Sequence, residues 1–215
     1  MATSVPARRA TRAAGQQTRA ALLRAAADLF ESDGDDVPLS QICAAAGAHP
    51  NQVTYYFGSK EALFVEVACG AVLRAGRRAE DDAARTTTVR AYTQALVETL
   101  LGAEAARVRL FVEAMLLAGR RPEHRPAVDS ALAQLYEAGE RALMDTLVRT
   151  GWELRAAPGV EARAFWSAVF GIAVQKHAGV SARSLEDAVT VVFTSLQIPE
   201  SVLDSPVPQP DRSRQ

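Results

Sequence analysis

Residues 39–63 read LSQICAAAGAHPNQVTYYFGSKEAL, and this stretch decides the fold of the N-terminal part of the chain. Ile42 and the alanines around it give residues 40–46 a small apolar face at helical spacing, which predicts a short helix that packs closely on a neighbour. Gly47 follows where that helix must end, because glycine readily adopts the left-handed conformation found just past a helix C-terminus. Pro50 fits the first turn of a second helix, where its missing N–H costs nothing.

The second helix of this stretch is short and polar. It presents Asn51, Gln52, Thr54 and Tyr55, and Val53 is among the few residues that can hold it against a core. A polar helix braced by another helix is what reading base edges in the major groove requires. The pattern therefore predicts a helix-turn-helix that binds double-stranded DNA.

The composition points to an all-α protein. Alanine, the best helix former, is very abundant, and no run alternates apolar and polar residues as a strand would. The 215 residues carry a formal net charge of −1 and only two cysteines, too few for a disulfide framework. No apolar stretch approaches the ~18–20 residues of a membrane span, and the N-terminus lacks the apolar core of a secretory signal. We expect a cytoplasmic protein with no membrane contact.

The chain divides into four predicted segments. Residues 1–16 form a disordered Arg-rich arm, which is either a solvated tail or an arm that reaches phosphates or the minor groove. Residues 17–63 form the DNA-binding domain, with its first helix starting near Gln17. Residues 64–196 form a larger helical domain, in which Ser184 and Asp187 have the spacing of a capping box. Residues 197–215 are polar and proline-rich, which predicts a disordered tail.

The stretch from about Thr18 to Phe64 resembles the TetR family of bacterial transcriptional repressors. Several motifs in the right order and spacing carry this resemblance, which makes it more specific than a lone helix-turn-helix pattern. They are Ala26, Leu29-Phe30, Gly34, Ile42, Ala46-Gly47, Phe57 and the run Ser59-Lys60-Glu61-Ala62-Leu63.

The resemblance implies an all-helical homodimer with about nine helices per subunit. Three N-terminal helices would bind a near-palindromic operator, and the last two would pack against the partner subunit. Ala48-His49, Asn51-Gln52 and Thr54 depart from the residues common in the family, so the operator sequence cannot be transferred. The implied DNA contacts are Gln41, Asn51, Gln52, Thr54, Tyr55, Tyr56 and Lys60.

The strongest functional hypothesis is a repressor that a largely apolar small molecule releases from DNA. For each aromatic candidate the alternative is plain core packing. Glu113 either faces solvent or has a partner, because a lone buried carboxylate is costly. His177 is either a ligand contact or a partner of a helix C-terminus. The candidate pocket residues are Phe111, Glu113, Met115, Tyr136, Trp166, Phe170 and His177.

The sequence leaves three other classes of function as alternatives. A thiol-responsive regulator would sense through Cys43 or Cys69, although cysteines among alanines and aliphatic residues are usually inert. In an effector-independent DNA-binding protein, dimerisation would be the sole role of the large C-terminal region. An enzyme is not expected, because the three histidines have no zinc-type spacing and the chain has neither a phosphate-binding glycine loop nor a nucleophile elbow. Neither a metal nor a cofactor is predicted.

Overall fold

The computed structural model describes residues 5–150, 156–180, 184–196 and 200–206. Within these ranges the regular elements are helices, and the only β-type pairing is an isolated antiparallel bridge between Thr88 and Pro206. The chain divides into two compact units, Met1–Cys69 and Gly70–Gln215. The predicted all-α fold is confirmed, and the boundary between the units falls six residues after the predicted end of the DNA-binding domain at Leu63.

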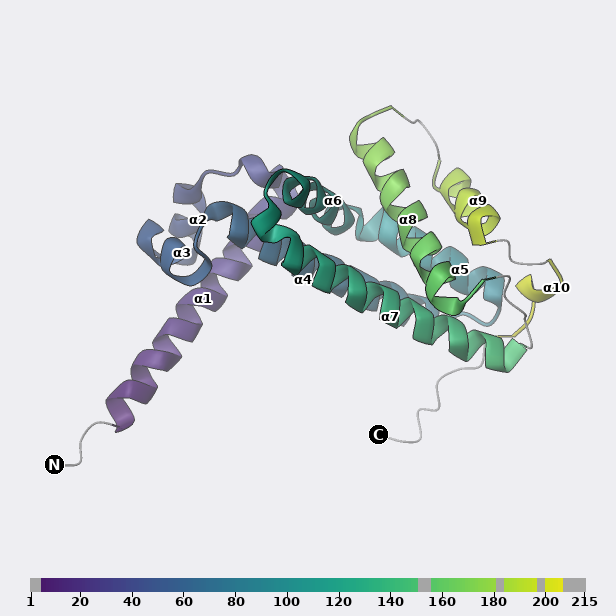
Figure 1. The fold of residues 1–215 in the computed structure, drawn as a ribbon, viewed down its shortest axis with the longest axis horizontal. Helices are drawn as coiled ribbons and strands as arrows, with labels where there is room; N and C mark the ends of the chain where they lie inside the picture. Colours follow the sequence, from purple (N-terminus) through teal and green to yellow (C-terminus); the bar gives the residue numbers. More distant parts are fainter. Residues whose placement is uncertain (1–4, 151–155, 181–183, 197–199, 207–215) are drawn as a thin grey trace. The chain divides into compact units, whose positions relative to one another are not determined.

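The first unit is a small helical domain built around aromatic and aliphatic side chains. Phe30 and Phe64 meet edge to face, with ring centroids 5.1 Å apart, and Leu22, Ile42 and Val53 are buried beside this core. Burying these side chains is the main force that holds such short helices together. The elements are α1 (Val5–Asp33), η1 (Gly34–Asp36), α2 (Leu39–Ala46), α3 (Pro50–Phe57) and the first part of α4 (Lys60–Ala83) (Figure 1).

The first helix begins earlier than the sequence predicted. α1 starts at Val5 and not near Gln17, so residues 5–16 are helical and the predicted disordered arm is wrong over that range. Alanine and arginine are strong helix formers, and no proline follows Pro6 to interrupt the helix. The glycine inside the helix has a packing reason, because a Cβ added at Gly15 would lie 3.2 Å from the Tyr56 hydroxyl oxygen. Residues 1–4 lie outside the described ranges.

The turn between α2 and α3 has the predicted geometry. Gly47 adopts φ 60° and ψ 35°, in the left-handed region, and its N–H donates to the Ala44 carbonyl. The N–H of Ala48 donates to the Cys43 carbonyl at 2.9 Å, which satisfies another of the last carbonyls of α2. Ser59 caps α4, since its Oγ accepts from the Ala62 N–H at 3.0 Å. The helix-turn-helix predicted from residues 39–63 is therefore present.

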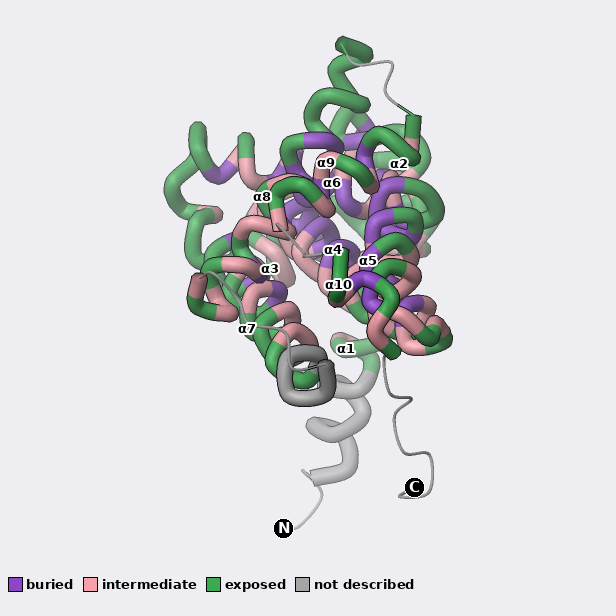
Figure 2. Tube along the Cα trace, turned by 90° about the vertical axis from the view of Figure 1, so that its right-hand side faces the viewer, coloured by how far each residue is buried: buried purple, intermediate pink, exposed green. Residues whose placement is uncertain are grey.

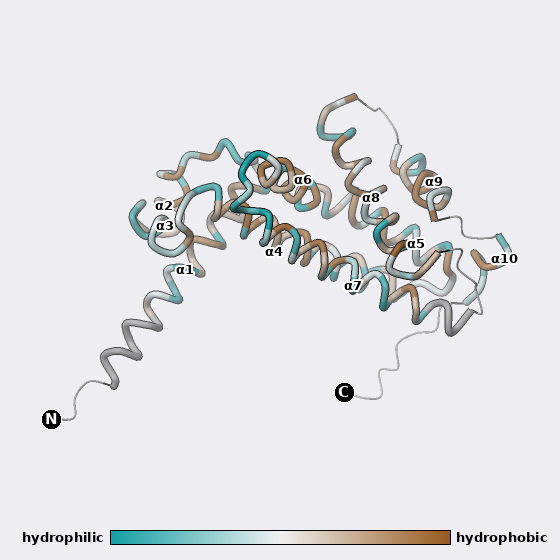
Figure 3. Tube along the Cα trace, in the orientation of Figure 1, coloured by the Kyte–Doolittle hydropathy of each residue, from teal (hydrophilic) through white to brown (hydrophobic). Residues whose placement is uncertain are grey.

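The helices of the second unit pack around α8. This helix lies against α6, α7 and α9, and α5 lies against α9. Buried and exposed stretches alternate along these helices in Figure 2, and apolar and polar stretches alternate along them in Figure 3, as expected of amphipathic helices. The elements are the rest of α4, α5 (Val89–Glu98), a π-helical turn η2 (Thr99–Ala103), α6 (Ala105–Arg120), η3 (Pro122–His124), α7 (Arg125–Thr150), α8 (Pro158–His177), α9 (Leu185–Leu196) and α10 (Glu200–Leu203).

The described end of the chain packs back onto the start of α5. The Val89 N–H donates to the Ser205 carbonyl at 3.1 Å, Arg90 pairs with Asp204 at 3.4 Å, and Leu203 is buried. The predicted tail over 197–215 is therefore wrong for residues 200–206, because an apolar side chain gives this segment a place in the core. Residues 197–199 and 207–215 lie outside the described ranges.

The predicted cap of α9 is confirmed. The Ser184 N–H donates to Asp187 Oδ2 and the Asp187 N–H donates to Ser184 Oγ, each at 3.1 Å. These two bonds satisfy donors that the first turn of a helix leaves without partners.

In the described part of the chain, no helix is long and apolar enough to span a bilayer.

Candidate nucleic-acid interface and ligand cavity

One face of α3 is free to contact DNA. Asn51, Thr54 and Tyr55 are exposed, and their spacing of three and four residues places them on one side of the helix. Tyr55 is 82% exposed, which is unusual for an aromatic side chain without a partner molecule. Val53, on the opposite side, is only 1% exposed and anchors α3 to the core. Gln41 is exposed on α2.

Gln52 has a structural role that the sequence analysis did not predict. Its Oε1 accepts from the His49 N–H at 2.8 Å, so the side chain reaches back over the start of α3. This is the glutamine half of a capping box, and it satisfies a backbone donor at the helix N-terminus. His49, which departs from the residue common in the family, is therefore held by a hydrogen bond from its backbone N–H to Gln52. The Gln52 side chain is only half-exposed, unlike Asn51 beside it.

The C-terminal end of α3 is fixed by contacts with α1. Tyr56 is half-buried and lies edge to face with Tyr55, with centroids 4.9 Å apart. The Arg19 guanidinium lies over the Phe57 ring, 4.8 Å from its centroid, and Nη2 donates to both carboxylate oxygens of Glu66 at 2.5 and 2.6 Å. This arginine of the basic N-terminal region is thus paired within the protein.

Lys60, the predicted phosphate contact, lies in the first turn of α4. Its Nζ donates to the Asp35 carbonyl of η1, so in this structure the ammonium group is held by the loop that follows α1. A backbone carbonyl is a neutral acceptor, so its hydrogen bond with Lys60 does not offset the positive charge of the ammonium group. The group stays available to a phosphate at the cost of one hydrogen bond.

Three of the predicted pocket aromatics form a cluster in the second unit. Phe111 and Phe170 have ring centroids 5.5 Å apart, and Trp166 stacks on Phe170 at 5.4 Å. Phe111 is fully buried and Phe170 is 8% exposed, so both act in the core. Met115 and Tyr136 are half-buried, and the Tyr136 ring is covered by the guanidinium of Arg163 at 5.5 Å.

Glu113 and His177, far apart in the sequence, come together. Glu113 Oε1 accepts from Arg109 Nη1 at 2.7 Å and lies 3.6 Å from His177 Nε2. The Glu113 side chain is 17% exposed, and its Oε2 is buried without a hydrogen-bond partner. Of the two possibilities for Glu113, the structure therefore shows the paired one.

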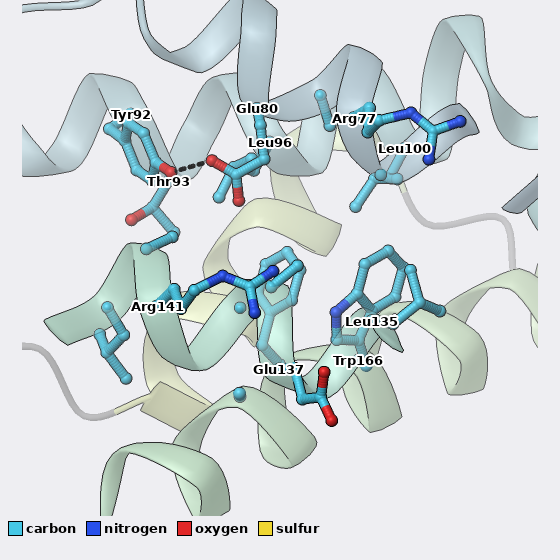
Figure 4. A pocket seen from close by; sticks show the side chains of 18 of the residues that line it. Arg77, Glu80, Tyr92, Thr93, Leu96, Leu100, Leu135, Glu137, Arg141 and Trp166 are labelled. Carbon is cyan, nitrogen blue, oxygen red and sulfur yellow. Dashed lines mark hydrogen bonds between the residues drawn. The ribbon is translucent and has the colours of Figure 1, made fainter. Parts of the chain in front are cut away.

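A cavity of about 580 Å³ lies in the second unit between α4, α5, α7 and α8. Trp166 is the only residue of the predicted pocket set that lines it; Phe111, Glu113, Met115, Tyr136, Phe170 and His177 do not. The walls are mainly aliphatic and aromatic, with charged groups on α4 and α7 (Figure 4). The lining residues are Leu73, Gly76, Arg77, Ala79, Glu80, Asp81, Val89, Tyr92, Thr93, Leu96, Leu100, Gln134, Leu135, Glu137, Ala138, Gly139, Arg141, Ala142, Leu143, Glu161, Ala162, Phe165, Trp166 and Leu196.

Glu80 is a half-buried carboxylate in the lining of this cavity. Its Oε2 accepts a hydrogen bond from the Tyr92 hydroxyl, which Figure 4 draws beside Thr93 and Leu96. Burial raises the pKa of the Glu80 carboxyl; the bond from Tyr92 opposes that shift and the nearby Asp81 charge adds to it. Sequence reasoning did not find Glu80, because it belongs to the charged run RRAEDD (residues 77–82), a composition typical of a solvated segment.

A tight helical turn that presents an exposed polar helix, followed by a helical unit with an internal cavity, defines a helix-turn-helix transcriptional regulator. Residues 22–67 match the family of bacterial regulatory proteins called the tetR family, and residues 89–193 match the family described as bacterial transcriptional repressor C-terminal. The chain belongs to the TetR family of bacterial transcriptional regulators. No curated protein matches it.

Solved structures agree with this assignment. A crystal structure assigned as a transcriptional regulator from Rhodococcus sp. RHA1 is 59% identical, covers 88% of this chain and all of its own, and superposes with a TM-score of 0.83. A regulator from Saccharomonospora viridis in complex with choline is 18% identical, covers 85% of this chain and 98% of its own, and has a TM-score of 0.65. The fatty acid degradation regulator FadR from Bacillus halodurans is 16% identical over 83% of this chain and 94% of its own, with a TM-score of 0.63. The last two likenesses concern the fold alone.

Proposed function

We propose that this protein is a ligand-responsive repressor that binds a near-palindromic operator as a homodimer and leaves it when a small molecule occupies the cavity. The observation that carries the proposal is the cavity of about 580 Å³, a volume typical of small-molecule sites. Such a protein works where operator DNA is, in the bacterial cytoplasm.

Continuity of one helix supports the link between ligand and DNA. α4 runs without interruption from Lys60 to Ala83, so the helix that provides Leu73, Gly76 and Glu80 to the cavity also begins beside the DNA-binding helix. A ligand that binds better to one setting of this helix shifts the population toward that setting. By reciprocity, operator DNA then weakens the binding of the ligand by the same factor.

Exposed apolar residues on α8 support the dimer. Val160 and Val174 are 50% and 44% exposed, and Gly171 lies exposed between them. Apolar surface that is left open along one helix is typical of a protein–protein contact. A two-fold pair of subunits would present two α3 helices to two half-sites, which is why the expected operator is an inverted repeat.

Selection of bound fragments from the source organism's genomic DNA tests the proposal. The purified protein should enrich a few fragments that share an inverted repeat, and sedimentation should give a dimer at the same concentration. Enrichment without an inverted repeat would contradict the dimeric operator reader. A thermal-shift screen in which no small molecule both stabilises the protein and releases the selected fragment would favour effector-independent DNA binding.

A further inference from the structure

We propose that the cavity takes a ligand that carries a positively charged nitrogen on an apolar body, with the Glu80 carboxylate as its counter-ion. This inference rests on the proposed function, because it names the chemical class of the effector of that same cavity. Three observations in the second unit carry it: an unpaired carboxylate, the balance of charge around the cavity, and the aromatic surface opposite.

The Glu80 carboxylate has no cationic partner among the described residues. It accepts one hydrogen bond there, from the neutral Tyr92 hydroxyl, and forms no ion pair with a described lysine, arginine or histidine. The charge that acts on it is the carboxylate of Asp81, which has the same sign and raises the pKa of Glu80. A carboxylate removed from water without a counter-charge is costly, and the raised pKa of Glu80 reflects that cost. A cationic ligand would supply the missing charge.

The described lining of the cavity carries more negative than positive charge. Among the described residues, four carboxylates line it, on Glu80, Asp81, Glu137 and Glu161, against two guanidinium groups, on Arg77 and Arg141. Both arginines are exposed, as are Asp81 and Glu137, whereas Glu80 and Glu161 are half-buried. Figure 4 shows the Arg77 side chain directed away from Glu80. In a low-dielectric cavity the excess of negative charge favours a cation and disfavours an anion. Arg141, which Figure 4 shows directed into the space between the helices, is the described group that would best hold an anion instead.

Aromatic and aliphatic side chains form the opposite wall. Trp166 and Phe165 meet edge to face with centroids 5.6 Å apart, and both line the cavity. The Trp166 side chain is held by its stack on Phe170, so its position is fixed before any ligand arrives. Indole faces attract cations as well as apolar groups. Leu135 lies beside Trp166 in Figure 4, and Leu96 and Leu100, on the side of Glu80, add further apolar surface for the body of the ligand.

Three probes of the same shape test the head group. Phenylbutylammonium, phenylbutanol and phenylbutyrate share an apolar body and differ in the charge of one end. Calorimetric titration into the purified protein near neutral pH should give the cation an affinity about tenfold above that of the alcohol, with the carboxylate weakest. A tightest affinity for phenylbutyrate would overturn the proposal in favour of Arg141 as the anchor. Equal affinities for all three probes, or no binding of any of them, would also overturn it.

Two isosteric variants locate the effect. Glu80→Gln keeps an acceptor for the Tyr92 hydroxyl and removes the charge, so the preference for the ammonium over the alcohol should disappear while the alcohol still binds. Glu137→Gln removes one charge from an exposed position of the same cavity and should keep the preference. Loss of the preference in Glu137→Gln alone would place the counter-ion elsewhere and contradict the assignment of Glu80.

Release of operator DNA separates this inference from the proposed function. If the cation binds through Glu80 and the selected DNA fragment stays bound, the proposed ligand class is supported and ligand-driven release of DNA is refuted. If all three probes release the fragment equally well, ligand-driven release is supported and the proposed preference for a cationic ligand is refuted.

Discussion

Arg19 on α1 and Glu66 on α4 form a two-pronged ion pair, with Nη2 of the arginine 2.5 and 2.6 Å from the two carboxylate oxygens. The same guanidinium covers the Phe57 ring at the end of α3, so one side chain connects three helices of the DNA-binding unit. The pair sets the position of the first part of α4 relative to α1. Both side chains are about 40% exposed, so solvent screens their attraction.

A double-mutant cycle on Arg19→Ala and Glu66→Ala should give a coupling free energy of about 0.5–1 kcal/mol in the stability of the folded protein. Urea unfolding of the four proteins measures it, and the value should fall in high salt. Arg19→Ala should cost more than Glu66→Ala, because it also removes the contact with Phe57. Equal costs for the two single variants would contradict the role of that contact.

Gly47→Ala should destabilise the protein by about 1 kcal/mol, because alanine is strained at the observed φ of 60°. Urea unfolding is the measurement, and weaker operator binding should accompany it, since the turn orients α3. Gly119→Ala is the matched control: it lies within α6 with open space around it and no positive φ, so it should be neutral or slightly stabilising.

Two substitutions separate the two roles of Gln52. Gln52→Ala removes both the cap on His49 and any base contact, so it should lower stability by about 1 kcal/mol and change the preferred operator sequence. Gln52→Glu keeps an acceptor for the His49 N–H and should preserve stability while it still changes sequence preference. Unfolding curves and selection of bound fragments measure the two effects. If the preferred operator sequence is unchanged in both variants, Gln52 caps the helix and makes no base contact.

Lys60→Ala should weaken binding to all DNA sequences alike and lower the salt dependence of affinity by about one charge, since the side chain is expected on a phosphate. Affinity measured against salt concentration tests this. Tyr55→Ala is a useful comparison, because Tyr55 is uncharged and 82% exposed on α3. It should leave the salt slope unchanged. A shallower slope in Tyr55→Ala than in Lys60→Ala would reverse the two assigned roles.

The pH dependence of stability should reveal Glu80. Its pKa is raised from the ordinary value of 4.5, so the stabilisation that comes from binding this proton is complete below that value and is lost as pH rises through the raised pKa. Glu80→Gln should therefore gain stability relative to the wild type as the pH increases above 4.5. Urea unfolding at a series of pH values measures the difference. A difference that shrinks with rising pH would show that the carboxylate is stabilised in its charged form.

Thiol reagents should leave DNA binding unchanged. Burial, with a smaller contribution from the Glu66 charge, raises the pKa of the Cys69 thiol to about 11, so about one molecule in a thousand carries the thiolate at pH 8. Burial raises the pKa of the Cys43 thiol as well. Alkylation by iodoacetamide, followed by mass spectrometry, should be slow, and operator affinity should not change. Rapid alkylation of either cysteine with loss of DNA binding would support the thiol-responsive alternative.

The sequence by itself determined the features that depend on a few neighbouring residues. The turn at Gly47, the start of α3 at Pro50 and the capping box of Ser184 and Asp187 were predicted and are present, because backbone preferences and caps act within one helical turn. The order of these local features was enough to give the fold class and the family. A local pattern gave the wrong answer where charge or proline content was taken for disorder, at residues 5–16 and 200–206.

Only the tertiary structure decided which residues meet. Glu80, in a charged run, lies in the cavity with Tyr92 on another helix, while Phe111 and Phe170 pack together in the core. The pairing of Glu113 with His177 likewise joins α6 to the end of α8. The physical reason is that burial and electrostatic partners depend on how distant segments pack, and helical periodicity indicates which face of a helix is apolar without indicating what covers it.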